Sequence, residues 1–225
     1  MLRHTAFAMT LVLTIFLAVF AAQVSGKTIA KTIQQTDLER MLSLTKGMTN
    51  KPPSWRPDVA ACNWQGAFCN TAGSVTEIAW YGGLGLGGSA NLTMLPQGLT
   101  YFHLENNNLT GVAEFAFLPR GLLTLDLSSN AFSGSPNLTS LPQRLQDLYL
   151  GYNGVSGLPN LTSPPRGLLQ LSLYYNLFSG SGTFAPPTGS SNWCTNYPTQ
   201  YYMCGQRANC NGAFNCSAGV WSCLP

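Results

Sequence analysis

Four stretches of the chain decide its fold, because they repeat one pattern: LTYFHLENNNLTG (99–111), LLTLDLSSNAFSG (122–134), LQDLYLGYNGVSG (145–157) and LLQLSLYYNLFSG (168–180). Each stretch begins 23 residues after the one before it. A fainter copy begins 24 residues earlier with Val75, Ile78 and Trp80, and it has Gly83 where the later copies have asparagine. A fixed period of this length predicts a solenoid, in which each copy buries its apolar side against its neighbours.

The spacing inside each copy predicts a short strand followed by a turn. The second and third apolar residues are two apart and therefore point to one side of a strand, while the residues beside them point to the other side. We expect the asparagine that follows to be structural, since its amide can bond backbone groups of its own coil and of the next. These asparagines are Asn107, Asn130, Asn153 and Asn176. The glycine at the end of each stretch eases the next turn.

The pattern L-x-x-L-x-L-x-x-N-x-L-x-G resembles the leucine-rich repeat. The resemblance implies a right-handed α/β solenoid of about five repeats of 23–24 residues, with a short parallel sheet, an irregular convex side and a cap at each end. The Leu-Pro-x-x-Leu linkers at Leu95, Leu118 and Leu141 are also similar to those of the leucine-rich surface antigens of kinetoplastid protozoa.

The segment before the repeats has the features of a cap. Thr36 and Glu39 form a capping box that predicts the start of a short helix, and Gly47 is placed to end it. The stretch CNWQGAFC (62–69) resembles the N-terminal cap of plant-type extracellular leucine-rich repeat proteins, although those caps commonly have two cysteine pairs. We predict a signal peptide at 1–26, an N-terminal cap at 27–73, repeats at 74–185 and a cysteine-rich C-terminal cap at 186–225.

The N-terminal segment indicates secretion. Residues 6–22 are an uncharged run, and small residues follow at 24–26, where a signal peptidase could cleave. An uncleaved signal anchor is the alternative, although 17 residues only just reach the length of a membrane span. No later stretch is long and apolar enough to cross a bilayer. The predicted location is therefore secreted, or on the extracellular surface.

The cysteines favour disulfides over a metal site. Their spacing lacks the closely paired ligands of zinc sites, and only one histidine follows the signal segment. Pairing Cys62 with Cys69 leaves five in the tail, which allow 15 ways of forming two bridges with one thiol unpaired. The odd cysteine is then either free or intermolecular. The tail cysteines are Cys194, Cys204, Cys210, Cys216 and Cys223.

Charge excludes some classes of partner. The chain has 11 basic and 8 acidic residues, so its formal net charge is only +3. Nucleic-acid binding needs a basic footprint that neutralises several phosphates, and binding to an acidic membrane surface needs a polybasic cluster. Neither is present, and the composition points to no cofactor.

The repeat register predicts which strand residues face solvent on the concave side. Four columns cross five strands. The first two contain Glu77, Tyr101, Thr124, Asp147 and Gln170, then Ala79, His103, Asp126, Tyr149 and Ser172. The other two contain Tyr81, Glu105, Ser128, Gly151 and Tyr174, then Gly82, Asn106, Ser129, Tyr152 and Tyr175. Charge in these columns is confined to four carboxylates, with no Lys or Arg.

Tyrosine and carboxylate side chains make this concave face a candidate binding surface. Tyrosine offers a rigid contact area with a polar tip, although strands also carry tyrosine from β-propensity alone. The candidate ligand-binding residues are Tyr81, Tyr101, His103, Glu105, Asp126, Asp147, Tyr149, Tyr152, Tyr174 and Tyr175.

His103, Asp126 and Ser128 lie close enough in the register to suggest a hydrolase triad. A triad needs a nucleophile that reaches the base and donors for the oxyanion. We expect Ser128 to lie beside Asp126 instead, so we predict no catalytic residues. A milder hypothesis is that Asp126 keeps His103 charged to a higher pH, which would make binding pH-sensitive.

The sequence also contains five N-x-S/T motifs, which are acceptors for N-linked glycans in a secreted protein. Three Asn-Leu-Thr copies share one register on the outer side of the coil, and Asn108 lies at a strand exit. The motifs begin at Asn91, Asn108, Asn137, Asn160 and Asn215. Asparagine in these motifs could instead serve only to form turns.

These observations together predict an extracellular protein that recognises a protein or glycan through its concave face and has no enzymatic activity. Two alternatives remain open. The chain could be a structural coat or matrix glycoprotein, or it could inhibit a secreted hydrolase, a role that some plant-type relatives suggest.

Overall fold

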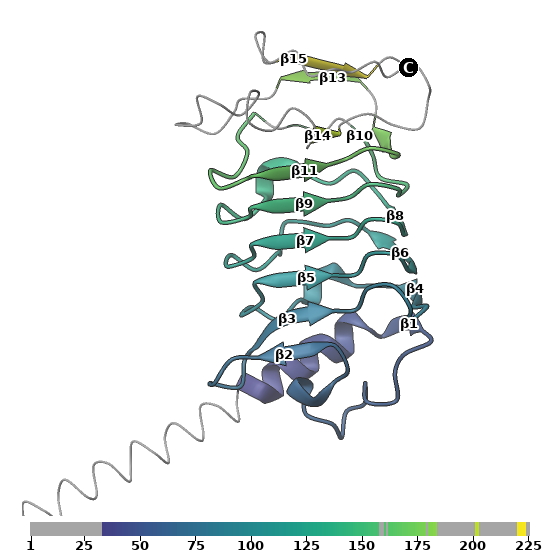
Figure 1. The fold of residues 1–225 in the computed structure, drawn as a ribbon, viewed down its shortest axis with the longest axis vertical. Helices are drawn as coiled ribbons and strands as arrows, with labels where there is room; N and C mark the ends of the chain where they lie inside the picture. Colours follow the sequence, from purple (N-terminus) through teal and green to yellow (C-terminus); the bar gives the residue numbers. More distant parts are fainter. Residues whose placement is uncertain are drawn as a thin grey trace, which may run out of the picture.

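The computed structural model describes residues 33–157, 160, 162–178, 180–183, 201–202 and 220–223. The described coils stack along one axis, with the N-terminal helix at one end and strands of the C-terminal tail at the other (Figure 1). The predicted signal peptide, Asn215 and four of the tail cysteines, Cys194, Cys204, Cys210 and Cys216, lie outside the described residues. Their cleavage, glycosylation and pairing stay predictions.

A seven-stranded sheet runs the length of the stack. It is parallel except for β2, which pairs antiparallel with β3. In spatial order its strands are β2 (Ala67–Cys69), β3 (Val75–Ala79), β5 (Tyr101–His103), β7 (Thr124–Asp126), β9 (Asp147–Tyr149), β11 (Gln170–Ser172) and β14 (Tyr201–Tyr202). Five of these strands are the predicted ones, whereas β2 from the cap and β14 from the tail extend the sheet at its two ends.

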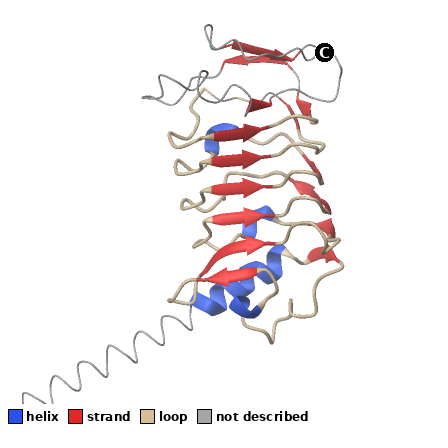
Figure 2. Cartoon of the chain, in the orientation of Figure 1, coloured by secondary structure: helices blue, strands red, loops and turns tan. Residues whose placement is uncertain are grey.

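A second sheet lines another side of the same coils (Figure 2). It contains β1 (Gly47–Thr49), β4 (Gly87–Ser89), β6 (Asn108–Val112) and β8 (Ala131–Ser133), with β1 antiparallel to β4. The pair β10 (Ser156–Gly157) and β12 (Leu177–Phe178) repeats this arrangement further along. The repeat pattern did not predict this second sheet. The N-x-L-x-G ends of neighbouring repeats pair because equivalent coils bring equivalent backbone groups into register.

The remaining elements are short. In the described part of the chain, the 3₁₀ helices are η1 (Ala61–Asn63), η2 (Leu92–Met94) and η3 (Leu138–Ser140). Near the C-terminus, β13 (Gly180–Thr183) pairs antiparallel with β15 (Val220–Cys223). Among the described residues, no helix has both the length and the apolar composition needed to cross a membrane.

The core is the line of apolar repeat positions inside the stack. All sixteen of these side chains are at most 6% exposed. They are Leu99, Phe102, Leu104 and Leu109, with their equivalents Leu122, Leu125, Leu127, Phe132, Leu145, Leu148, Leu150, Val155, Leu168, Leu171, Leu173 and Phe178. The solenoid predicted from the 23-residue period is therefore confirmed.

The repeat asparagines form a ladder through the stack. In each coil the Nδ2 group donates to a carbonyl of the preceding coil, as Asn153 does to Leu127 at 2.9 Å. The Oδ1 atom accepts a backbone N–H of that same preceding coil, such as the N–H of Phe132, also at 2.9 Å. The other members are Asn107, Asn130 and Asn176. These amides have the structural role that the repeat pattern predicts.

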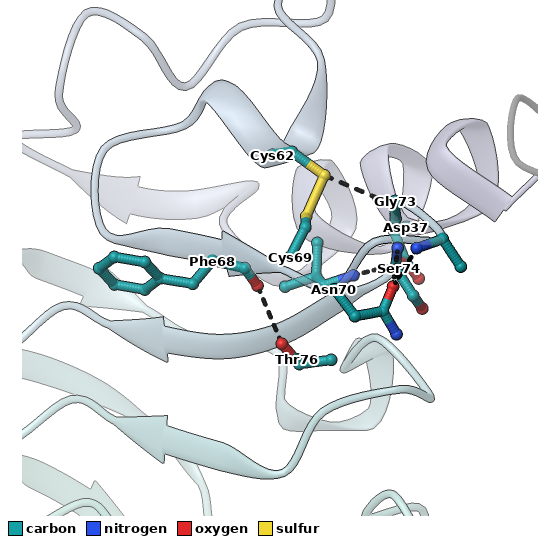
Figure 3. Close-up of a disulfide and its surroundings, with 10 residues drawn as sticks. Asp37, Cys62, Phe68, Cys69, Asn70, Gly73, Ser74 and Thr76 are labelled. Atoms are coloured by element: carbon teal, nitrogen blue, oxygen red, sulfur yellow. Dashed lines mark hydrogen bonds between the residues drawn. A yellow bond between two sulfur atoms is a disulfide. The ribbon is translucent and has the colours of Figure 1, made fainter.

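The N-terminal cap covers the first coil with aromatic side chains and one disulfide. The ring of Trp55 lies between those of Trp64 and Trp80, with centroid distances of 5.8 and 3.9 Å. The disulfide joins Cys62 to Cys69 beside the start of β3 (Figure 3). The first coil has Gly83 in place of a ladder asparagine and no coil before it. The cap covers this end of the stack in place of a neighbouring coil.

The predicted capping box is wrong. The helix is already formed at residue 33 and ends at 44, so Thr36 is not its first residue and Gly47 lies in β1. Asp37 points inward instead, and its Oδ2 atom accepts the N–H of Val75 at 2.8 Å and the hydroxyl of Ser74 at 3.4 Å (Figure 3). This carboxylate ties the helix to the first coil, a long-range contact that local spacing does not reveal.

Candidate ligand-binding face

Backbone pairing brings the predicted solvent columns together on the outward side of the seven-stranded sheet, which we call the sheet face. Tyr101 lies opposite Thr124, which lies opposite Asp147, and Asp147 lies opposite Gln170. In the next column His103 lies opposite Asp126, and Asp126 lies opposite Tyr149. Side chains more than 20 residues apart in sequence therefore become neighbours.

Three positions that we expected to face solvent are buried: Thr124, Gly151 and Ser172. The Thr124 hydroxyl donates to Oδ2 of Asp147 at 3.2 Å. A Cβ atom at Gly151 would lie 2.9 Å from the ring of Tyr174, so that ring covers the glycine. The alternation of side chains along a strand predicts that these three residues face solvent, so it does not account for their burial.

The first half of the sheet face carries the charge. The Asp126 Oδ1 atom accepts both the backbone N–H and the hydroxyl of Ser128, at 2.9 and 2.6 Å. The Nδ1 atom of His103 lies 3.8 Å from Oε2 of Glu105. The ring of Tyr81 meets the imidazole edge-on, with a centroid distance of 6.4 Å. This arrangement gathers acid, base and aromatic groups at the ends of three neighbouring strands, β3, β5 and β7.

Burial raises the pKa of the Asp126 carboxyl above its ordinary value, although the Ser128 bonds and the His103 imidazole act in the opposite direction. Burial likewise raises the pKa of Glu105, and the negative charge of Asp126 adds to that effect. The pKa of Asp147 is also raised by burial. These carboxylates are crowded and poorly solvated, so the region attracts positive charge.

The second half of the sheet face is aromatic. The rings of Tyr152 and Tyr175 stack with centroids 4.4 Å apart and planes 8° from parallel. Tyr174 meets both rings at steep angles, at 5.0 and 5.4 Å. We call Tyr152, Tyr174 and Tyr175 the tyrosine cluster. Tyr152 and Tyr175 remain 47% and 43% exposed, so the cluster offers substantial ring surface to a ligand.

Tyr149 lies between the two halves. Its hydroxyl donates to Oε1 of Gln170 on the neighbouring strand. Burial, with smaller effects from Asp147 and Asp126, raises its pKa to about 12. The phenol therefore stays protonated and acts as a fixed donor rather than as a charge.

The residue before each ladder asparagine has a left-handed backbone. Its φ is 58° at Asn106, 54° at Ser129, 55° at Tyr152 and 51° at Tyr175. This conformation costs an L-residue about 1–2 kcal/mol. Such strain in a bulky residue often accompanies a functional site. Two members of the tyrosine cluster occupy these positions.

The triad geometry is absent. The Ser128 hydroxyl donates to the carboxylate of Asp126 and not to the imidazole of His103. The ion-pair contact of His103 is with Glu105, a residue that the triad hypothesis did not include. The L-x-x-L-x-L spacing does place 103 and 105 on one side of the strand, and this signal could have predicted their contact. Whether Asp126 keeps His103 charged stays a prediction.

The described glycosylation motifs lie at the surface, and the asparagines of all four are exposed. Asn91 and Asn137 cap η2 and η3, and each accepts the N–H and the hydroxyl of the threonine two residues later. Asn160 bonds Thr162 in the same way. Asn108 begins β6 instead. Each capping motif therefore forms a turn and still presents its asparagine to solvent.

A hollow of about 600 Å³ lies away from the sheet face. Arg40 from the N-terminal helix and Arg120 line it together with the exposed side chains of Met94 and Phe117. The repeat pattern did not single out these residues, since they come from the N-terminal helix and from two different coils.

Comparisons with known proteins agree with this architecture. The leucine rich repeat family matches residues 97–155. The ectodomain of BIR2 from Arabidopsis thaliana is 25% identical over 64% of this chain and 82% of that one, with a TM-score of 0.53. The ectodomain of the receptor kinase SOBIR1 from the same plant is 30% identical over the same shares, with a TM-score of 0.49. No curated protein sequence matches significantly.

The chain thus contains leucine-rich repeats and folds as a leucine-rich repeat solenoid, similar to the ectodomains of plant receptor kinases. The solved structures include the Arabidopsis receptor kinase HAESA in complex with the peptide hormone IDA and the co-receptor SERK1. That receptor is 26% identical over 64% of this chain and 30% of its own, with a TM-score of 0.46. The resemblance to kinetoplastid antigens stays a prediction.

Proposed function

We propose that the chain is an extracellular recognition protein whose sheet face binds a protein or glycan ligand without catalysis. The observation that carries this proposal is the tyrosine cluster. Three tyrosines in mutual contact, two of them on strained backbone and nearly half exposed, form a rigid aromatic surface. Such surfaces bind partners at low entropic cost, because the rings are already held in place.

The chemistry of the rest of the face agrees with binding. Its columns carry four carboxylates and no Lys or Arg, so a ligand meets acceptors in one half and rings in the other. Catalysis is disfavoured because the hydroxyl of Ser128, the nucleophile of the triad hypothesis, is bonded to an acid rather than to the base. The predicted signal peptide, the Cys62–Cys69 disulfide and the exposed glycosylation motifs support an extracellular location.

The test is a binding screen of the purified secreted chain against a glycan array and a panel of extracellular proteins. The double variant Tyr152→Ser and Tyr175→Ser is compared with wild type. A matched control, Val112→Ser with Phe117→Ser, removes two equally exposed apolar side chains that lie outside the sheet face (60% and 61% exposed).

We expect the tyrosine variant to lose at least tenfold in affinity for any ligand found, and the control to bind as wild type does. Ligands that bind the tyrosine variant unchanged, or that depend on Val112 and Phe117, would show that the sheet face is not the recognition surface. In that case the two alternatives, a structural coat glycoprotein and an inhibitor of a secreted hydrolase, would gain support.

A further inference from the structure

Three side chains with metal-ligating atoms meet in the charged half of the sheet face. They are His103 at the end of β5, Glu105 two residues later, and Asp126 at the end of the neighbouring strand β7. One ligand atom from each lies within 4.8 Å of the other two. We call these residues the central trio. The repeat register produces it, since positions 103 and 105 share a side of one strand and 126 lies directly opposite 103.

One oxygen of the trio lacks a hydrogen bond. The Oε2 atom of Glu105 is fully buried, and it is the sole buried side-chain nitrogen or oxygen atom without a hydrogen-bond partner in the described part of the chain. Its contact with Nδ1 of His103 is 3.8 Å long, which is too long for a hydrogen bond. A buried carboxylate oxygen without a partner costs free energy, so its occurrence needs an explanation.

The surroundings of the trio provide no permanent cation. The sheet-face columns contain no Lys or Arg, and the other ion pair among the described residues, Arg56 with Asp58, belongs to the cap. Two carboxylates therefore share one imidazole. A bound metal ion would satisfy the free oxygen of Glu105 and neutralise both acids at once.

The remaining partners hold the trio in an arrangement suited to metal binding. Ser128 donates two hydrogen bonds to Oδ1 of Asp126, which orients that carboxylate as outer-shell partners orient metal ligands. Tyr81 packs edge-on against the imidazole of His103. Ligand atoms around tetrahedral zinc lie roughly 3.4 Å apart, given bonds of about 2.0–2.2 Å. Small side-chain rotations would close the present separations to that value.

We propose that His103, Glu105 and Asp126 bind one divalent transition-metal ion, with Zn²⁺ preferred over Mg²⁺ and Ca²⁺. One imidazole nitrogen with two carboxylate oxygens suits zinc, whereas the hard cations prefer ligand sets made of oxygen alone. Three protein ligands leave a coordination position open toward solvent. This inference goes beyond the proposed recognition function and does not depend on it.

The sequence offers a direct reporter for the test. The chain has two histidines, and the other, His4, lies in the predicted signal peptide. The imidazole signals of the secreted protein therefore report on His103 alone, provided that it is purified without a histidine tag. Free thiols are first blocked by alkylation, so that the odd cysteine cannot bind the metal.

The experiment is a titration of this protein with ZnCl₂, followed by NMR of His103 and by calorimetry. One equivalent should shift the imidazole signals, while the same concentration of MgCl₂ leaves them unchanged. Glu105→Gln and Asp126→Asn should each weaken zinc binding at least tenfold, and zinc should raise the Tm of wild type but not of these variants. Glu77→Gln, which changes a carboxylate of the same face outside the trio, should bind zinc normally.

Two results would overturn the proposal. The His103 signals could titrate with pH yet ignore zinc, which would mean that the trio is only an ion pair. Zinc could also shift them equally in wild type and in Glu105→Gln. A circular dichroism spectrum like that of wild type shows that a variant is folded, and Glu105→Asp serves as a second variant if Glu105→Gln is not.

Discussion

Two neighbouring positions of the repeat differ in where their side chains lie and in whether the residue type varies between coils. Asn107, Asn130, Asn153 and Asn176 turn inward and form the same bonds in every coil. The residues just before them share one left-handed backbone but have no common side chain: Asn106, Ser129, Tyr152 and Tyr175. A buried amide must satisfy fixed backbone groups, whereas a side chain on the face has no such requirement.

The difference shows where this fold allows specialisation. The ladder requires asparagine at each step, because each amide forms hydrogen bonds to backbone groups that water cannot reach. The sheet face varies from coil to coil, so it can hold carboxylates in its first half and tyrosines in its second. Four predictions test this contrast, from the largest expected effect to the smallest.

Asn153→Ala should destabilise the protein by roughly 2–4 kcal/mol, because it leaves the N–H of Phe132 without its partner and removes the shorter of the two amide bonds to the carbonyl of Leu127. Urea denaturation measures the loss. The matched control is Asn106→Ala, an exposed asparagine of the face, which we expect to change stability by less than about 1 kcal/mol. Equal losses in the two variants would refute the contrast between ladder and face.

Removing the disulfide tests whether the cap replaces the ladder at the first coil. The double variant Cys62→Ala and Cys69→Ala opens a short loop, and chain entropy predicts a loss of about 2.5 kcal/mol. Hydrogen exchange should show that protection falls in β2 and β3 and stays unchanged in β9 and β11. A uniform loss across the stack would instead mean that the cap and repeats unfold as one unit.

Ser129→Gly should stabilise the protein by about 0.5–1 kcal/mol. Glycine adopts the φ of 54° without strain, and this gain exceeds the entropy that glycine adds to the unfolded chain. Thermal unfolding measures the change. Ser128, one residue earlier, does not have a positive φ. Ser128→Gly should therefore destabilise the protein, since it gains no relief of strain and removes the hydroxyl bond to Asp126. A destabilised Ser129→Gly would show that the left-handed backbone there is not strained.

The smallest expected effect concerns Asp37. Its carboxylate accepts the backbone N–H of Val75, much as the ladder amides accept backbone N–H groups, but it can carry a charge. Burial raises its pKa above the ordinary value, so the folded state binds its proton more tightly than the unfolded state does. Stability should therefore fall as pH rises through the window between the ordinary pKa and the raised one. Asp37→Asn keeps an acceptor without the charge, and denaturation between pH 3.5 and pH 7 should show a weaker decline. An unchanged pH profile would contradict this.

The sequence by itself determined the stack, its core and the ladder. Each depends only on spacing within a coil and on a neighbour with the same spacing, so the 23-residue period was enough to predict Asn153 inside and Tyr152 outside. The same period placed His103 opposite Asp126.

The tertiary structure alone decided the contacts between unlike parts. Asp37 bonds Val75 across 38 residues, β2 and β14 extend the sheet, and Thr124, Gly151 and Ser172 are buried although they belong to the solvent columns. The free oxygen of Glu105 and the stacking of Tyr152 on Tyr175 also belong here. These features depend on side-chain rotamers and on how non-equivalent segments pack, and a repeat pattern does not specify either.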